Sequence, residues 1–195
     1  MNAALFQENV IKNDLVHNDH ELLQDLIERV ERLETNAPED RLSLGVMSGN
    51  MDTTMAALII AVGAAAYDME VDLFFTFWAT ASLRDPNKSV KKKGKEKLFG
   101  MMLPNGADEL PLSKMQMGGF GPMMIRKVLA EHGAKSLEEL FEDAAAADVK
   151  IHVCTMSMDF MGIKKEELIE YPHLDFCGVG TFIDLVTTSK NCWFM

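Results

Sequence analysis

Hydrophobic residues near the N-terminus recur every three or four positions, which sets this part of the chain apart from the rest. Charged residues lie between them, so the pattern between residues 20 and 39 predicts an amphipathic helix that ends near Pro38. The stripe is shorter than the three or four heptads of a typical coiled coil. It is compatible with a helix that packs on its own domain and with a contact between subunits. The stripe consists of Leu23, Leu26, Val30 and Leu33.

From Leu42 onward, short apolar runs alternate with helix-like segments, which predicts βαβ units around a parallel sheet. Ser136 and Glu139 have the spacing of a capping box, which marks the start of one helix. We expect a three-layer α/β fold with about five mainly parallel strands in a flavodoxin-like order. The expected strands are residues 42–47, 71–77, 151–154, 174–177 and 192–195, and the expected helices are residues 53–67, 122–132, 136–147 and 181–188, with helical turns at 164–170.

Residues 85–121 are too long for a simple connection, and such segments are usually functional or mobile. The segment first carries a run of lysines and then becomes rich in methionine and glycine. We therefore expect an N-terminal helical extension, residues 1–40, and one α/β domain, residues 41–195, that contains this insertion. The lysines are Lys88, Lys91, Lys92, Lys93, Lys95 and Lys97.

The insertion has two features with open interpretations. Its lysines could hold an anionic substrate or an acidic partner, although most charge runs are solvated loops. The methionines in and after it could be soft-metal ligands, but an apolar lid or subunit contact is the simpler interpretation, because Met adapts to irregular surfaces. These methionines are Met101, Met102, Met115, Met117, Met123 and Met124.

The composition excludes several classes of protein. A net charge of −11 argues against general binding to DNA or RNA, because neutralising phosphates requires clustered Lys and Arg. The N-terminal residues lack the basic and apolar regions of a secretory signal, and no apolar run reaches the roughly 20 residues of a membrane-spanning helix. We therefore expect a cytoplasmic protein without a membrane span and without a nucleic-acid partner.

The chain has three cysteines and no Cys-x-x-Cys pair, which favours free thiols over a disulfide framework or a zinc site. His132, His152 and His173 have no partner at ligand spacing, and each is interpreted as structural. No metal or other cofactor is expected.

Ligands of open α/β sheets collect at the carboxyl ends of the strands, where loops converge and helix N-termini present free N–H groups. Cys154 and Cys177 lie at such strand ends. Cys192 opens the last expected strand at its amino end and is interpreted as a core residue. The other candidate crevice residues are Ser48, Gly49, Asn50, Trp78, Thr155, Met156, Ser157 and Gly178.

Cys154 is the candidate reactive residue. It ends an expected strand, and Thr155 and Ser157 after it are suited to open a helical turn. A thiol at a helix N-terminus has a pKa below the free value of about 8.5, so its thiolate can attack sulfur. The alternative interpretation of Cys154 is a small buried hydrophobe. Cys177 could act as a second thiol if its strand neighbours that of Cys154, and it is otherwise a buried spacer.

Several segments of the domain are similar to a known family. The most specific is Val153 to Ile163, where Ser-Met-x-x-Met-Gly follows the cysteine. From about Leu42 to its end, the chain resembles the DsrE/DsrF-like proteins, and above all a subgroup described as peroxiredoxin-like or DsrE-like. The other segments that carry the resemblance are Val46 to Asp52, Phe74 to Trp78, the Met- and Gly-rich insertion and Gly178 to Phe182.

The resemblance implies a three-layer α/β fold, homo-oligomers of three or more subunits, and transfer of sulfane sulfur or thiosulfonate groups between cysteines. Cys154 would then hold the sulfur group and exchange it with a TusA-like carrier or a rhodanese, in a sulfurtransferase-type reaction. Some relatives have another cysteine close to this loop, whereas methionines stand at the nearby positions here. Cys177 is therefore the remaining candidate for a second thiol.

Two other functions stay open at this point. A non-enzymatic binding or scaffold subunit could hold a small anion or nucleotide in the crevice, with an incidental thiol. Thiol peroxidase activity is the weaker alternative, because the chain has neither a Cys-x-x-Cys nor a Thr-x-x-Cys loop.

Overall fold

The computed structural model describes residue 20 and residues 22–195, and the chain divides into two compact units, Met1–Pro38 and Glu39–Met195. In the first unit, residues 22–35 are helical. The helix ends at Asn36, whose side-chain amide donates a hydrogen bond of 2.7 Å to the carbonyl of Arg32. The amphipathic helix is thus confirmed, and it ends just before Pro38 as expected.

The second unit is built on a five-stranded sheet in which every paired strand is parallel. This confirms the predicted fold class. The strand order is β4-β3-β2-β1-β5, which differs from the flavodoxin order 2-1-3-4-5. The difference arises because four strands are added in one direction before β5 joins the free edge of β1. The strands are β1 (Glu39–Val46), β2 (Glu70–Phe75), β3 (Lys150–Cys154), β4 (Leu174–Cys177) and β5 (Ser189–Phe194).

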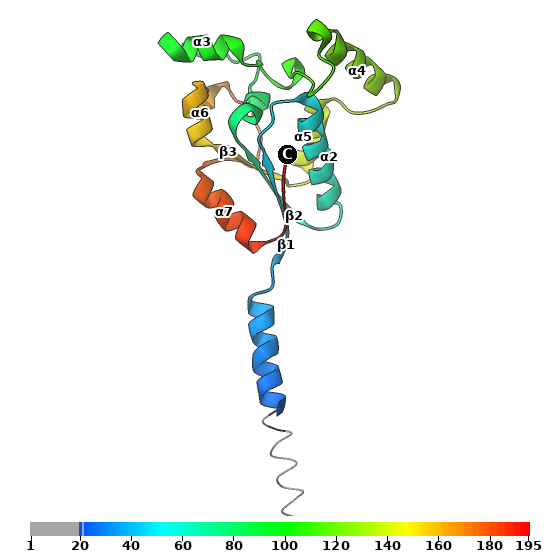
Figure 1. Ribbon diagram of the computed structural model, residues 1–195, viewed down its shortest axis with the longest axis vertical. Coiled ribbons are helices and arrows are strands. Elements are labelled where there is room, and N and C mark those ends of the chain that lie inside the picture. Colours follow the sequence, from blue (N-terminus) through cyan, green and yellow to red (C-terminus); the bar gives the residue numbers. More distant parts are fainter. Residues whose placement is uncertain (1–19, 21) are drawn as a thin grey trace, which may run out of the picture. The chain divides into compact units, whose positions relative to one another are not determined.

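One face of the sheet is covered by helices α2 (Met51–Ala65) and α5 (Leu137–Ala146), and Figure 1 shows both on the same side. Successive strand residues point to opposite faces, so every second residue packs against these helices. Leu44, Leu73 and Val153 are fully buried in the resulting apolar core. The capping box is confirmed, because Ser136 and Glu139 exchange side-chain and backbone hydrogen bonds at the start of α5.

The opposite face carries helix α7 (Val179–Thr188), with the short helix α6 (Thr155–Met161) on the same side (Figure 1). The connection from β4 to β5 runs back across the sheet, so a right-handed crossover places α7 on this side. On this face, the alternate strand residues include polar and small ones together with Phe74, whose ring stacks on Phe182 of α7. Asp72, His152 and Cys154 are buried on it. We call it the α7 face.

The insertion at residues 85–121 is not an open loop, because much of it is helical. It contains α3 (Gly94–Met102), the 3-10 turns η2 (Ala107–Glu109) and η3 (Met117–Gly119), and the start of α4 (Phe120–Glu131). Figure 1 shows α3 and α4 beyond one end of the sheet. The remaining 3-10 turns are η1 (Phe77–Leu83) and η4 (Lys165–Glu167).

A buried ion cluster holds the start of this insertion. The Nε atom of Arg84 lies 3.1 Å from Glu167 Oε2, and Nζ of Lys92 lies 2.6 Å from Glu167 Oε1. Arg84 also donates a hydrogen bond of 2.8 Å to the carbonyl of Pro104. These contacts join the start of the insertion to η4, and the two cations offset the desolvation of the buried Glu167 carboxylate.

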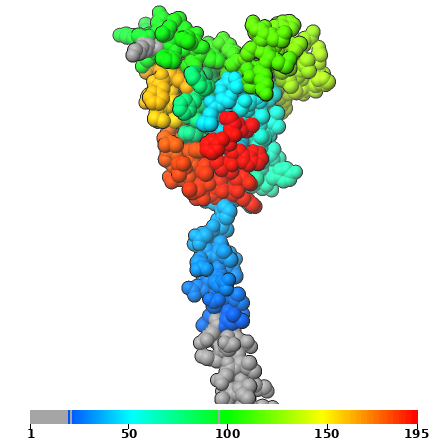
Figure 2. Space-filling view, viewed as in Figure 1, coloured from blue at the N-terminus to red at the C-terminus, as the bar shows by residue number. Residues whose placement is uncertain are grey.

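Within the described residues, no helix is both long and apolar enough to cross a bilayer. Large apolar side chains are nevertheless exposed on the C-terminal strand. Trp193 and Phe194 are examples, and Figure 2 shows this strand in red at the surface of the second unit.

Candidate functional site

Cys154 lies at the junction of β3 and α6. It is 2% exposed and belongs to a small buried cluster with Phe74, Cys177 and Phe182. The rings of Phe74 and Phe182 stack with their centroids 4.6 Å apart. The thiol is therefore enclosed by apolar groups at a strand end, on the α7 face and apart from the main core.

Hydroxyl groups from the end of β2 and from α6 meet beside this thiol. Thr76 Oγ1 and Ser157 Oγ lie 2.9 Å apart, and Ser157 Oγ also accepts a 2.9 Å hydrogen bond from the N–H of Phe77. Burial raises the pKa of Cys154, but hydrogen bonds from the side chain and N–H of Ser157, from Thr76 and from the N–H of Met156 outweigh it. The pKa of Cys154 is thereby lowered from the usual value of a thiol, so the reactive thiolate is more populated.

Cys177 is the direct neighbour of Cys154, because the two residues pair in register on β3 and β4. Burial, the nearby charge of Asp175 and that of Cys154 raise the pKa of Cys177 to about 11. Thr155 Oγ1 donates a hydrogen bond of 3.3 Å to the carbonyl of Cys177 and so ties the two strand ends together. The two thiols are adjacent, yet their environments shift their pKa values in opposite directions.

Cys192 differs from its sequence-based interpretation. It lies inside β5, not at the amino end of the strand, and it is half-buried. It packs against the cluster that contains Cys154 and Cys177. The predicted strand began three residues too late, because Ser189 to Asn191 are polar and exposed or half-buried residues of an edge strand. Burial raises the pKa of Cys192, so this thiol is less readily ionised than an ordinary one.

The loops after β1 and β2 approach each other closely. A Cβ atom on Gly49 would lie 2.7 Å from the carbonyl oxygen of Trp78, so the close approach requires glycine. Asn50 donates a hydrogen bond of 2.6 Å to Ser48 Oγ. Phe77 adopts a left-handed φ of 47°, an unfavourable conformation for a non-glycine residue. These predicted crevice residues therefore lie at the same carboxyl edge of the sheet as Cys154.

Exposed apolar side chains border this edge. Phe77 and Trp78 follow β2, Met156 and Phe160 lie on α6, and Val179 begins α7 next to the exposed Gly178. We call these five side chains the apolar rim.

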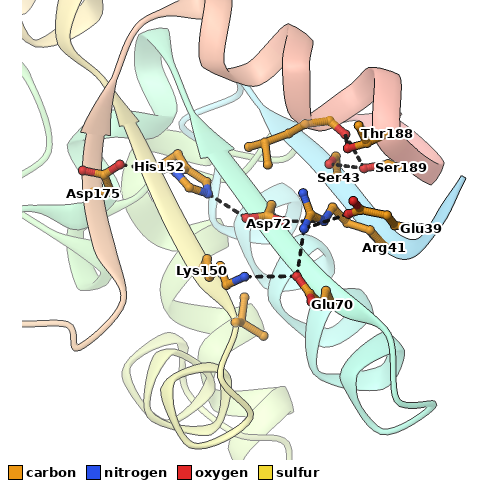
Figure 3. A network of polar contacts seen from close by, with 12 residues as sticks. Glu39, Arg41, Ser43, Glu70, Asp72, Lys150, His152, Asp175, Thr188 and Ser189 are labelled. Atoms are coloured by element: carbon orange, nitrogen blue, oxygen red, sulfur yellow. Dashed lines mark hydrogen bonds and ion pairs between the residues drawn. The ribbon is translucent and has the colours of Figure 1, made fainter.

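A buried ionic network occupies the amino-terminal half of the α7 face (Figure 3). Asp72 Oδ1 lies 2.7 Å from His152 Nε2, and Asp72 Oδ2 lies 3.4 Å from Arg41 Nε. Arg41 also contacts Glu39 and Glu70, each at 2.9 Å. His152 therefore has a hydrogen-bond partner that sequence spacing did not reveal, and its interpretation as a structural residue agrees with this contact.

Sequence reasoning also missed Thr76 as a site residue. Its hydroxyl helps to lower the pKa of Cys154, but it lies at the end of a different strand. A threonine at the carboxyl end of an apolar strand was the available signal. Only the pairing of β2 with β3 makes it relevant.

The lysines of the insertion are not all solvated. Lys92 is buried against Glu167, and Lys88 lies 3.4 Å from Glu170. Lys91, Lys93 and Lys97 are exposed and, with the two paired lysines, line a hollow of about 610 Å³. Anion binding by this segment stays a prediction.

The methionines of the insertion and α4 are exposed or nearly so, as a flexible lid or a subunit contact requires. Among the described residues, no group of three or more His, Cys, Asp or Glu side chains could hold a metal ion.

The sequence profile of the DsrE/DsrF/DrsH-like family matches residues 38–194. This span includes all five strands and the cysteine loop. The chain belongs to the DsrE/DsrF/DrsH-like family. The resemblance seen in its motifs is thereby confirmed.

Several known proteins are similar to this chain over most of their length. A Bacillus subtilis (strain 168) protein, "Uncharacterized protein YrkE", is 44% identical over 144 residues, which cover 73% of this chain and 89% of that protein. The "Sulfur carrier protein DsrE2" of Allochromatium vinosum is 30% identical over 162 residues, which cover 80% of this chain and 99% of that protein. The crystal structure of the ychN protein from E. coli has a TM-score of 0.47 and 10% identity, and the match covers 80% of this chain and 99% of that one.

Proposed function

We propose that this protein is a sulfur carrier that binds sulfane sulfur or thiosulfonate on Cys154 and exchanges it with partner proteins. One observation carries the proposal: hydrogen bonds lower the pKa of Cys154 although the thiol is buried. Membership of the DsrE/DsrF/DrsH-like family and similarity to a protein named as a sulfur carrier support it.

The chemistry is thiol–disulfide-type exchange. The Cys154 thiolate attacks the outer sulfur of a persulfide or hydropolysulfide donor, a new S–S bond forms on Cys154, and the donor leaves as its thiolate. With tetrathionate as donor, Cys154 keeps a thiosulfonate group and thiosulfate leaves. An incoming partner thiolate then attacks the sulfur bonded to Cys154 Sγ, takes over the sulfur group and releases Cys154 as its thiolate. The ionised fraction of Cys154 needs no general base, and the hydrogen bonds that lower its pKa increase that fraction.

We expect a single-thiol mechanism. Cys177 is close enough to be considered as a second thiol, but its pKa of about 11 keeps it protonated near neutral pH. A protonated thiol is a poor nucleophile toward the sulfur held on Cys154. Cys177 therefore contributes to the enclosure of the site, and Cys154 does the exchange.

Partner proteins need a surface on which to dock, and the apolar rim supplies one. Cys154 is only 2% exposed, so side chains around the thiol must move before a large partner reaches the sulfur. We propose a TusA-like or rhodanese-like carrier as the partner. A homo-oligomer of three or more copies and a cytoplasmic location complete the proposal.

Mass spectrometry after incubation with hydropolysulfide or tetrathionate tests the proposal. We expect a mass increase of one sulfur atom with hydropolysulfide and of one thiosulfonate group with tetrathionate, mapped to Cys154 and reversed by a reductant. The Cys154→Ser variant should take up neither group, whereas the matched Cys192→Ser variant should load as the parent does. A folded parent protein with unmodified Cys154 would contradict the proposal.

The burial of Cys154 favours one alternative, a non-enzymatic subunit in which the thiol is incidental. The Cys154→Ser variant distinguishes a sulfur carrier from such a scaffold subunit. A carrier loses covalent trapping of a persulfidated partner on Cys154→Ser, whereas a scaffold keeps its partner with unchanged affinity.

A further inference from the structure

Within the described residues 22–35, the N-terminal helix carries an exposed apolar stripe. Leu22, Leu23, Leu26, Ile27, Val30 and Leu33 are between 45% and 69% exposed. An isolated helix as short as residues 22–35 is marginally stable in water, and packing of its apolar face normally supplies the missing stability. A stripe of this kind therefore needs a partner.

The stripe has the spacing of a coiled-coil seam. Leu23 and Val30 are seven residues apart, as are Leu26 and Leu33, and the steps from Leu23 along the stripe are three, four and three residues. The first pair thus occupies heptad positions a, and the second pair occupies positions d. Two such heptads are described, and Leu22 and Ile27 widen the seam at its flanks. In the second heptad, the β-branched Val30 at position a with Leu33 at position d is the combination that favours two parallel strands, whereas position a of the first heptad is Leu23.

The charges beside the seam match a parallel second copy. Arg29 occupies position g, and Glu34 occupies position e of the following heptad. In a parallel pair, these two positions face each other across the seam, so Arg29 of each copy meets Glu34 of the other. The charges of two parallel copies are therefore complementary in this register, and the symmetry of the pair provides the Arg29–Glu34 contact twice.

The same charges disfavour a lipid surface as the occupant. Helices that lie on membranes carry Lys and Arg on their polar face. Here the polar face carries the four carboxylates of Asp25, Glu28, Glu31 and Glu34 against the two guanidinium groups of Arg29 and Arg32. A net negative face is repelled by anionic lipid head groups.

We propose that the N-terminal helix pairs in parallel with the same helix of a second copy of this chain, through a seam of Leu23, Leu26, Val30 and Leu33. The pairing is independent of Cys154 and of sulfur transfer. It holds two globular units at high effective concentration, which favours their own association.

Disulfide trapping in the full-length protein tests the pairing at one position. In a parallel pair, the d position of one copy faces the same d position of the other, so the L26C variant should form an intersubunit disulfide in a glutathione redox buffer. The E28C variant is the matched control, since position f points away from the seam. We expect the effective molarity of the L26C disulfide to exceed that of E28C at least about tenfold. Equal effective molarities for L26C and E28C would overturn the proposal. An antiparallel pair or a membrane-bound helix would give this result, because neither brings two copies of position 26 together.

Charge reversal tests the register without altering the seam. In the L26C background, R29E or E34R alone places like charges opposite each other and should lower the effective molarity about fivefold. The combination of R29E with E34R restores opposite charges and should recover it to within about twofold. Failure of the double variant to recover, with both single variants weakened, would reject the parallel register.

Discussion

The two faces of the sheet use the same strands for different purposes. Against α2 and α5, the strands place fully buried apolar side chains such as Leu44, Leu73 and Phe75. On the α7 face, the alternate residues are mixed, with the polar Asp72 at one end and Cys154 beside Phe74 at the other. One face therefore stabilises the fold, and the other carries the groups with chemistry.

The comparison shows how a buried reactive group is tolerated in a small domain. Because the α7 face is partly polar, it buries less apolar surface, and the opposite face provides the apolar burial that stabilises the fold. In return, Cys154 gains hydroxyl and N–H donors that a purely apolar environment would lack. The expected consequences of substitutions on the two faces differ accordingly.

The largest effect is expected on the apolar face. Phe75→Ala removes a fully buried ring and should lower the free energy of unfolding by about 3–5 kcal/mol, because a cavity remains. Urea unfolding measures this loss. The pH profile of Cys154 alkylation in the folded fraction should be unchanged, and a shifted profile would show that the two faces are coupled.

The next effect is expected in the ionic network. Asp72→Asn keeps the shape but removes the charge that faces His152 and Arg41, and should cost about 1–3 kcal/mol in unfolding experiments. The matched control is Asp175→Asn, whose exposed carboxylate lies 4.0 Å from the other ring nitrogen of His152. It should change stability by less than about 0.5 kcal/mol. Similar losses of unfolding free energy in both variants would mean that the buried Asp72 carboxylate contributes no more to stability than the exposed Asp175 carboxylate.

A smaller difference is expected between the two neighbouring thiols. Cys154 has a lowered pKa and Cys177 a pKa of about 11, so a small alkylating reagent at pH 7 should modify Cys154 at least about tenfold faster. Lowering the pH through the pKa of Cys154 protonates the thiolate and slows the reaction, whereas raising the pH speeds it up to a plateau. Peptide mapping over a pH series measures both rates. Equal rates at pH 7 would remove the basis for a single-thiol carrier.

The smallest effect is expected for one hydroxyl of the site. Ser157→Ala removes a donor that lowers the pKa of Cys154, so the pKa should rise and alkylation at pH 7 should slow several-fold. Loss of the hydrogen bond to Phe77 should cost about 1 kcal/mol of stability. Thr155→Ala is the control, because its hydroxyl bonds the carbonyl of Cys177. If the pH profile of Cys154 alkylation shifted in Thr155→Ala and not in Ser157→Ala, Ser157 would not be the donor that lowers the pKa of Cys154.

Part of the candidate site could be predicted from the sequence. The strand-end rule placed Cys154, Cys177 and Trp78 at one edge of the sheet, where the structure also has them. Thr76 and the partner of His152 were missed, because a hydroxyl or a carboxylate on another strand has no recognisable spacing to its partner. The position of Cys192 was wrong for a related reason, since an edge strand has little apolar pattern to mark its start.

What could be derived from the amino-acid order is local. Periods of two and of three to four residues follow from backbone geometry, so they predicted the βαβ alternation, the N-terminal helix and its end before Pro38. The strand order and the polar pairs depend on contacts between distant residues. Thr76 and Ser157 are 81 positions apart, and Arg84 and Glu167 are 83 apart. Such contacts form when the chain closes long loops, and no local period encodes which distant residues then meet. The reactive character of Cys154 belongs to this second group, because donors from the end of β2 and from α6 lower its pKa.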